Sequence, residues 1–161
     1  MAKFSWHTGA VPEGLPVRQV YGFLFSRDGR LLIRVDGTKH SLPGGKPEPG
    51  ELAYADILRR ETLEEVTINI QDPHYLGYQR VDDGVQPYAQ VRMISIITRV
   101  YPCAPDPDNG RTYLRLLTHP NRAGDLLNWG STGHQQSSAA ARAATAVLGL
   151  PHNGLPRETY I

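Results

Sequence analysis

Apolar and polar positions alternate along much of the chain in short runs typical of β-strands, and two segments have helical character. Residues 17–25 and 30–35 are rich in β-branched and aromatic side chains, and the four residues 26–29 between them read Ser-Arg-Asp-Gly. A connection of this length that contains glycine is typical of a β-hairpin. Residues 54–65 predict a helix, so the hairpin leads through a loop into this helix.

The second half of the chain is expected to supply the centre of the sheet. Residues 90–101 form the most apolar segment, and residues 93–97 within it (Met-Ile-Ser-Ile-Ile) are expected to be buried on both faces. Residues 102–110 contain three prolines and predict a loop. The alanine-rich residues 137–148 predict a second helix that ends before Gly149. Further strands are expected at residues 68–70, 75–81 and 113–117.

Strands that alternate with two helices predict an α/β fold in which a mixed β-sheet lies between the helices. No internal repeat or heptad pattern interrupts this order. At 161 residues the chain is expected to form a single domain, residues 1–161, with a core from about 17 to 148. That length is sufficient to bury a hydrophobic core without disulfides or structural zinc.

The formal charge of +1 provides no general attraction for a nucleic-acid polymer or a membrane surface. The N-terminal residues lack the apolar run of a signal peptide, and no run approaches the length of a membrane span. The single cysteine, Cys103, cannot form an internal disulfide, which favours a reducing compartment. We therefore expect a cytoplasmic protein that binds neither nucleic-acid polymers nor membranes, and the sequence leaves its oligomeric state open.

The strongest chemical signal is a group of acidic residues beside a glycine-rich loop. Five of the seven glutamates fall between residues 48 and 65. Residues three and four positions apart share a helix face, so Glu61, Glu64 and Glu65 project together with Arg60 beside them. Like charges at this spacing cost about 0.2–0.5 kcal/mol per pair on an exposed helix, which a bound cation would offset. Hard divalent ions such as Mg²⁺ prefer carboxylate, water and phosphate oxygens.

The loop before this helix, residues 44–51, reads GGKPEPGE. Its glycines permit backbone angles that are closed to other residues. The Gly44-Gly45 pair would let a backbone carbonyl approach an ion with no Cβ in the way.

This pattern resembles the Nudix box, whose signature is Gly, five residues, Glu, seven residues, Arg-Glu, an apolar residue, any residue, Glu-Glu, any residue, Gly and an apolar residue. The residues at the matching positions are Gly45, Glu51, Arg60, Glu61, Glu64, Glu65 and Ile68. Eight residues, 52–59, stand where the signature has seven, Thr62 replaces an apolar residue and Thr67 replaces the glycine. The extra residue precedes the acidic helix face and leaves its spacing intact, whereas Thr67 leaves open how the helix ends.

The resemblance implies a Nudix-like α/β/α sandwich and a metal-dependent pyrophosphohydrolase that cleaves the diphosphate of a nucleoside diphosphate linked to another group. It implies Mg²⁺, or Mn²⁺, bound by Glu61, Glu64, Glu65 and the Gly45 carbonyl, with Arg60 orienting the carboxylates. Glu64 or Glu61 is the expected general base. Family members also use a glutamate from a distant loop, and in this chain that role would fall to one of the aspartates Asp82, Asp83, Asp106, Asp108 and Asp125.

Five residues outside the acidic helix are candidates for contact with the substrate. Arg34 is one of them, Lys46 is either a phosphate contact or a surface lysine, and His40 stands at the entrance to the loop, where a strand-end histidine is the common alternative. Arg92 lies within the most apolar strand, where an arginine requires either a buried salt bridge or a polar cavity. Trp129 either stacks on a nucleobase or, more commonly for such a residue, caps the core.

Two other interpretations compete with an active site. A charged helix after a Pro/Gly turn is often only a solvated surface, although that leaves the glycine loop unexplained. A catalytically silent Nudix-like module could bind a nucleotide or a protein, although such a module is expected to lose a carboxylate that this chain keeps. The sequence does not select among nucleoside triphosphates, oxidised nucleotides, ADP-ribose and nucleotide sugars.

Overall fold

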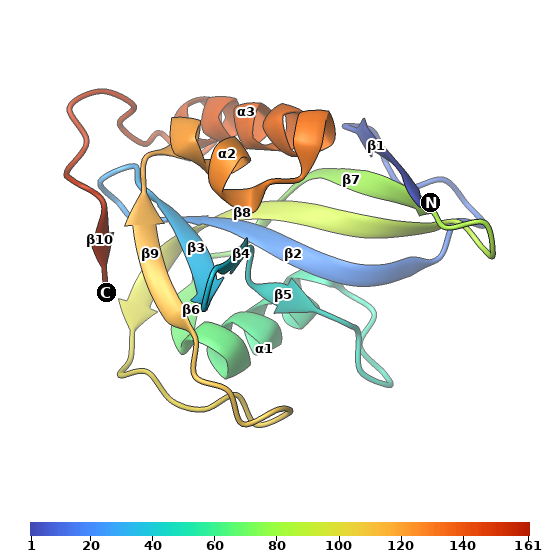
Figure 1. Ribbon diagram of the computed structural model, residues 1–161, viewed down its shortest axis with the longest axis horizontal. Helices are drawn as coiled ribbons and strands as arrows, with labels where there is room; N and C mark the ends of the chain where they lie inside the picture. The colour runs from blue at the N-terminus through green and yellow to red at the C-terminus, as the bar shows by residue number, and fades with distance from the viewer.

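The computed structural model describes residues 1–161 as a mixed β-sheet with helices on both faces (Figure 1). The helices are α1 (Tyr54–Val66), α2 (Ala123–Leu127) and α3 (Gly130–Ala146), with a 3₁₀ turn at Pro120–Arg122. None of them combines the length and hydropathy needed to traverse a lipid bilayer. The strands are β1 (Lys3–His7), β2 (Val17–Phe25), β3 (Leu31–Asp36), β4 (Lys39–Ser41), β5 (Gly44–Gly45), β6 (Ile68–Ile70), β7 (His74–Asp82), β8 (Tyr88–Val100), β9 (Leu114–Thr118) and β10 (Thr159–Tyr160).

Strand β8 lies at the centre of the sheet, whose order is β1-β7-β8-β2-β3-β9-β10, with β4 beside β3, β5 beside β2 and β6 beside β8. It pairs in parallel with β2 and antiparallel with β7. Residues 91–97 are all buried, which confirms the central strand predicted from the apolar run. The predicted hairpin has fewer paired residues than expected, because β2 and β3 pair only at Phe25 and Leu31. Strand β2 otherwise pairs with β8 and β5.

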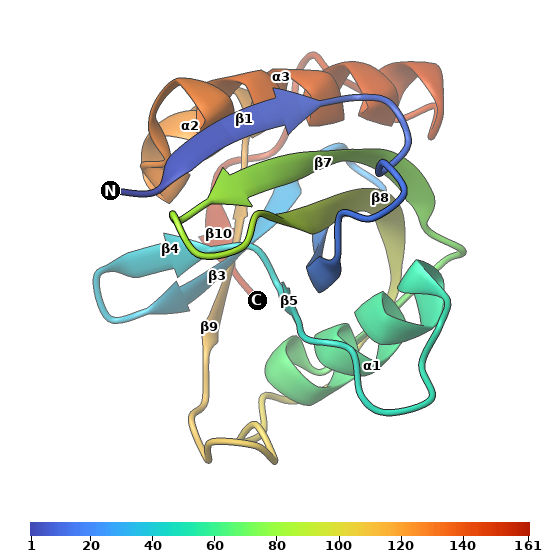
Figure 2. The ribbon, with the colours of Figure 1, turned by 90° about the vertical axis from the view of Figure 1, so that its right-hand side faces the viewer.

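The two faces of the sheet carry separate hydrophobic clusters of 14 buried residues each. Helix α1 covers one face, and α2 and α3 cover the other, as both views show (Figures 1 and 2). The helical residues in the first cluster are Ile57, Leu58 and Val66, and those in the second are Ala123, Leu127, Ala140 and Ala144. This arrangement confirms the mixed-sheet α/β/α sandwich.

Helix α3 begins at Gly130, whereas the alanine-rich pattern predicted a start at residue 137. The intervening residues include glycine, serine and threonine, which have low helix propensity. Packing overrides that propensity, because Gly133 lies so close to Trp129 that a Cβ on it would be 2.7 Å from the Trp129 Cβ. The strands β1, β4, β5 and β10 were not predicted. They are short and are defined by their pairing, which joins β1, β5 and β10 to distant strands and β4 to the preceding strand β3.

Helix α1 ends at a threonine that takes the left-handed conformation for which the box signature uses glycine. Thr67 has φ 53° and ψ 49°, and its N–H donates to the Thr62 carbonyl. Arg115 of β9 stabilises this end through Nη1, which donates to the Val66 carbonyl at 3.0 Å, the Thr67 hydroxyl at 2.9 Å and the Tyr101 carbonyl at 2.8 Å. Thr67 therefore makes a side-chain hydrogen bond with Arg115 that a glycine at this position could not make. Of the eight residues that separate Glu51 from Arg60, residues 52 and 53 precede α1 and residues 54–59 belong to it.

Candidate active site

The glycine loop lies against helix α1 because Gly45 has no side chain to separate its backbone from the helix. Gly44 has a positive φ of 149°, and its N–H donates to Glu65 Oε1 at 2.9 Å. A Cβ on Gly45 would lie 2.5 Å from the Glu61 carboxylate. Pairing of β5 with β2 holds both glycines in place. The backbone of the loop therefore reaches the acidic face of the helix.

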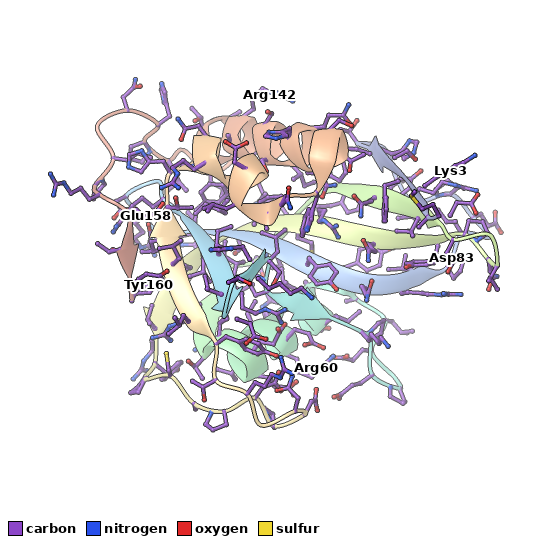
Figure 3. All side chains as sticks on the ribbon, viewed as in Figure 1. Lys3, Arg60, Asp83, Arg142, Glu158 and Tyr160 are labelled. Carbon is purple, nitrogen blue, oxygen red and sulfur yellow. The ribbon has the colours of Figure 1, made fainter.

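Arg60 is the centre of the acidic group and projects from α1 beside the loop (Figure 3). Its Nε and Nη2 donate to the two carboxylate oxygens of Glu51 at 3.0 and 2.9 Å. Its Nη1 donates to Glu61 Oε1 and Glu64 Oε2, each at 3.0 Å. Nη2 also donates to the Lys46 carbonyl at 2.8 Å, which ties the loop to the helix. One guanidinium thus orients three carboxylates and the loop backbone.

Acidic charge exceeds basic charge around Arg60. A fourth carboxylate, that of Glu48, lies 3.4 Å from Nη1, so four acidic side chains share one guanidinium. Hydrogen bonds from Arg60 lower the pKa of Glu51. Burial raises the pKa of Glu61 and that of Glu64, and the opposing effect of Arg60 does not cancel it. The ionised forms of these two glutamates are under-compensated, which favours a cation nearby.

Glu65 is held apart from the other carboxylates by a second arginine. Its side chain is buried, and it forms an ion pair with Arg34 of β3 while accepting the Gly44 N–H. Arg34 Nε donates to the Ser41 hydroxyl at 2.9 Å, and its guanidinium lies 4.4 Å from the centre of the Tyr113 ring. Arg34 is therefore fixed on both sides at the rim of the acidic group.

A cavity of about 310 Å³ opens over these residues. The loop after β8 forms one of its walls. Within this loop the carboxylate of Asp106 accepts the Asp108 N–H at 2.9 Å, whereas the Asp108 side chain is exposed and its charge contributes to the raised pKa of Glu61 and of Glu64. The lining residues are Arg34, Gly44, Gly45, Lys46, Pro47, Glu48, Arg60, Glu61, Glu65, Asp106, Asp108, Asn109 and Tyr113.

The donors around this cavity fit a hard divalent cation, since they are carboxylate and carbonyl oxygens with an excess of negative charge. No three acidic, histidine or cysteine side chains are grouped as metal ligands. The arginines explain this spacing, because Arg60 binds Glu61 and Glu64 while Arg34 binds Glu65. A cation that recruited all three glutamates would exchange with at least one of these guanidinium contacts.

A second cavity, of about 510 Å³, adjoins the first at Arg34, which lines both. His40 and Arg92 also line it, whereas Lys46 lines the first cavity. Arg92 is 1% exposed and forms no ion pair, so the buried salt bridge considered from the sequence is wrong. The full lining consists of Phe4, Tyr21, Arg34, Lys39, His40, Ser41, Leu42, Gln79, Gln90, Arg92, Asn128, Trp129 and Thr132.

The residues named from the sequence thus divide between the two cavities. Glu64 does not line the first cavity but is bound to Arg60 from beside it, with 24% of its side chain exposed. Trp129 both packs against the core of α2 and α3 and lines the second cavity.

Several lining residues were not identified from the sequence, including Tyr113, Tyr21 and the glutamines Gln79 and Gln90. A usable signal existed for Gln90, because it is a polar residue in the most apolar segment of the chain, whereas Gln79 lies in a strand that contains other polar residues. Gln90 lies two positions before Arg92 and shares its face of β8, and Gln79 is its register partner on β7.

Comparison with known proteins points to one family. Residues 15–115, more than half of the chain, match the family model described as the NUDIX domain. This segment contains the glycine loop, helix α1 and the strands β2 and β8. No curated protein sequence is similar enough to the chain to be matched.

Solved structures of low sequence identity share the fold. A putative Nudix hydrolase family member from Chromobacterium violaceum is 22% identical with a TM-score of 0.54, over 86% of this chain and 85% of that one. MutT studied from Aliivibrio salmonicida and Vibrio cholerae is 18% identical with a TM-score of 0.52, over 75% of this chain and 94% of that one. The Bacillus subtilis pyrophosphohydrolase BsRppH is 20% identical with a TM-score of 0.54 over 61% of each chain, so this chain spans less than two thirds of its length.

Proposed function

Because the chain belongs to the Nudix family of phosphoanhydride hydrolases, we propose that it is a metal-dependent pyrophosphohydrolase whose substrate is a nucleoside diphosphate linked to another group. The observation that carries the proposal is the four carboxylates around Arg60, packed against a loop backbone that only glycine permits. A solvated helix face has no need of this contact. The substrate is a small molecule, in keeping with the size of the two adjoining cavities.

A bound Mg²⁺ or Mn²⁺, held by Glu61, Glu64, Glu65 and the Gly45 carbonyl, would neutralise the diphosphate and increase the acidity of a water. Arg60 holds the carboxylates of Glu61 and Glu64 in a fixed direction. Either carboxylate can take the proton of the attacking water at an Oε atom, because burial has moved its pKa upward, towards the range of an effective general base.

The loop after β8 offers a second proton acceptor. Asp108 lines the first cavity and is close enough to influence both Glu61 and Glu64 electrostatically. If a residue outside the box acts as the general base, Asp108 of this loop is the aspartate that we propose for the role. Lys46 and Arg34 line the same cavity with positive charge, which supports contacts from them to phosphate oxygens.

The proposal is tested by product release from a panel of nucleotides with Mg²⁺. The panel contains nucleoside triphosphates, oxidised nucleotides, ADP-ribose and nucleotide sugars. Glu64→Gln preserves the shape of the side chain and removes its charge, so we expect kcat to fall by about 10²–10⁴. Glu13→Gln is the matched control, because Glu13 is exposed and distant in sequence from the box.

Full activity of Glu64→Gln would contradict this role for Glu64. Binding of nucleotides by the unsubstituted protein, with no hydrolysis at any Mg²⁺ concentration, would replace the hydrolase by a catalytically silent binding module.

A further inference from the structure

Arg92 is a buried cation that no acidic group balances. It lies in the middle of the central strand β8, is 1% exposed and forms no ion pair. Its Nη1 is buried and has no hydrogen-bond partner. A buried charged donor without an acceptor is costly, and its presence calls for a partner that the protein itself does not supply.

Aromatic rings stabilise this cation without satisfying its donors. The Arg92 guanidinium lies 5.0 Å from the centre of the Tyr21 ring and 5.2 Å from that of Trp129. Both distances are within the range of cation–π attraction. Burial lowers the pKa of Arg92 to about 10, so the group stays charged at neutral pH.

Arg92 also sets the direction of a chain of four glutamine amides. Its Nε donates to Gln136 Oε1 at 2.8 Å, which leaves the Gln136 amide nitrogen to donate to Gln79 Oε1 at 2.7 Å. Gln79 Nε2 donates to Gln90 Oε1 at 2.9 Å, and Gln90 Nε2 donates to Gln19. Because arginine can only donate, each amide in the chain receives at its oxygen and donates from its nitrogen.

This direction leaves Arg92 Nη1 as an unpaired donor beside the second cavity. Gln90 Oε1 already accepts from Gln79 and from Arg92 Nη2 at 3.4 Å, so both of its lone pairs are used. No acidic side chain lines the cavity, Lys39 adds positive charge, and Arg34 is paired with Glu65. A ligand group that satisfies Arg92 Nη1 has to accept a hydrogen bond.

The walls favour a flat ring over a small ion. Phe4, Tyr21 and Trp129 line the cavity, and its volume of about 510 Å³ exceeds the space that one phosphate needs. Arg34 connects it to the acidic cavity, so a molecule whose diphosphate lies there can place its attached group here.

We propose that this second cavity, the Arg92 pocket, binds a nucleobase that presents a carbonyl oxygen, and rejects the matching base that presents an amino group. Arginine donors pair with such carbonyls in nucleic-acid recognition. The proposal deepens the proposed function, on which it rests for the identity of the whole substrate. Since Nη1 is buried, the base reaches it when Tyr21 or Trp129 shifts, and Trp129 reports that shift by its fluorescence.

The test uses nucleosides without phosphate or metal, on the full chain carrying Trp6→Phe so that Trp129 is the only tryptophan. Inosine has a carbonyl at ring position 6, where adenosine has an amino group, and the neighbouring N1 changes with it from a donor in inosine to an acceptor in adenosine. We expect inosine to bind about tenfold more tightly, the ratio that a hydrogen bond to a charged donor provides. Uridine and cytidine repeat the comparison in a smaller ring.

Arg92→Lys keeps a positive charge but loses the forked donors, so the preference for inosine should weaken. Arg18→Lys is the matched control, because Arg18 also stacks on a tyrosine, Tyr88 at 4.5 Å, but is exposed and outside the pocket. If Arg92→Lys does not fold, the ratio of the inosine and adenosine affinities is compared between the unsubstituted pocket and Gln79→Leu. Gln79→Leu should reduce this ratio.

Equal or tighter binding of adenosine would overturn the proposal, as would an inosine preference that is undiminished in folded Arg92→Lys. A fluorescence change with inorganic phosphate that depends on Arg92, and none with nucleosides, would also overturn it in favour of an anion site. Failure of the proposed hydrolysis is a separate result, because an inosine preference in the metal-free protein does not depend on catalysis.

Discussion

At the scale of single residues, adjacent glycines do different things. A Cβ on Gly44 would meet backbone, 2.2 Å from the Val20 carbonyl oxygen, at a φ of 149° that side chains rarely adopt. A Cβ on Gly45 would meet only the end of the Glu61 side chain, which can move away. The first glycine is therefore required by the fold, and the second by the position of a carboxylate.

This difference predicts opposite outcomes for two alanine substitutions. Gly44→Ala should lower the free energy of unfolding by about 1–3 kcal/mol, measured by urea denaturation. Gly45→Ala should leave the stability within about 1 kcal/mol but displace the Glu61 carboxylate and reduce kcat by about 10²-fold. Loss of stability without loss of activity in Gly45→Ala would show that the contact with Glu61 does not position it for catalysis.

At the scale of elements, helix α1 depends on a residue far away in sequence. Arg115 is 5% exposed and donates to three acceptors around the C-terminus of the helix. These bonds hold the end that follows Glu65 and replace the usual glycine stop by Thr67. The same element keeps the acidic spacing of the box signature, because Arg60, Glu61, Glu64 and Glu65 all lie within α1.

Arg115→Met should destabilise the protein by about 2–3 kcal/mol, since it leaves buried carbonyls without donors. Thermal and chemical unfolding measure this loss. Arg99→Met is the control, because Arg99 stacks on Tyr101 nearby but is exposed, and it should cost less than about 0.5 kcal/mol. An equal loss of stability in the two variants would show that Arg115 does not stabilise the C-terminal end of α1.

The turn between β2 and β3 predicts a pH dependence. Hydrogen bonds from the Arg30 side chain, together with one from Ser26, lower the pKa of Asp28 to about 2. The ionised carboxylate therefore stabilises the fold above the ordinary aspartate pKa of about 3.9, and this contribution is lost as the pH falls towards 2.

Asp28→Asn should lower the free energy of unfolding by about 1 kcal/mol at pH 7, a value reduced for the partial exposure of the pair. Near pH 2 the substitution should have little effect on this free energy. Unfolding curves at both values of pH measure the difference, with the exposed Asp125→Asn as control. A loss that is the same at pH 7 and pH 2 would contradict an ionised Asp28 as its source.

At the scale of the whole molecule, the sequence predicted those helices and strands whose residues carry a clear periodic pattern. The range of β2 agrees with its prediction at residues 17–25, and α1, β6 and the central strand lie where the sequence placed them. The acidic helix face and the glycine loop were found because their spacing is local. Contacts that join distant segments were not found, namely the parallel pairing of β2 with β8, the Arg115 bonds and the glutamine chain.

The Arg92 pocket shows why sequence alone stopped short of the substrate. Arg92 was conspicuous in an apolar strand, but the meaning of its charge depends on Gln136 of α3, Gln79 of β7 and Trp129, which folding brings from three other segments. Only their arrangement reveals that Arg92 keeps an unpaired donor and that no acid balances its charge.

Direct observation of the metal tests the central claim most directly. In crystals soaked with Mn²⁺, the ion should lie about 2.1 Å from oxygens of at least two of the three glutamates Glu61, Glu64 and Glu65. Glu65 or Glu64 should then have exchanged a guanidinium contact for the ion, since Arg34 and Arg60 hold these carboxylates apart without it. An ordered helix α1 with no Mn²⁺ at its acidic face, at saturating Mn²⁺, would contradict a metal-dependent hydrolase.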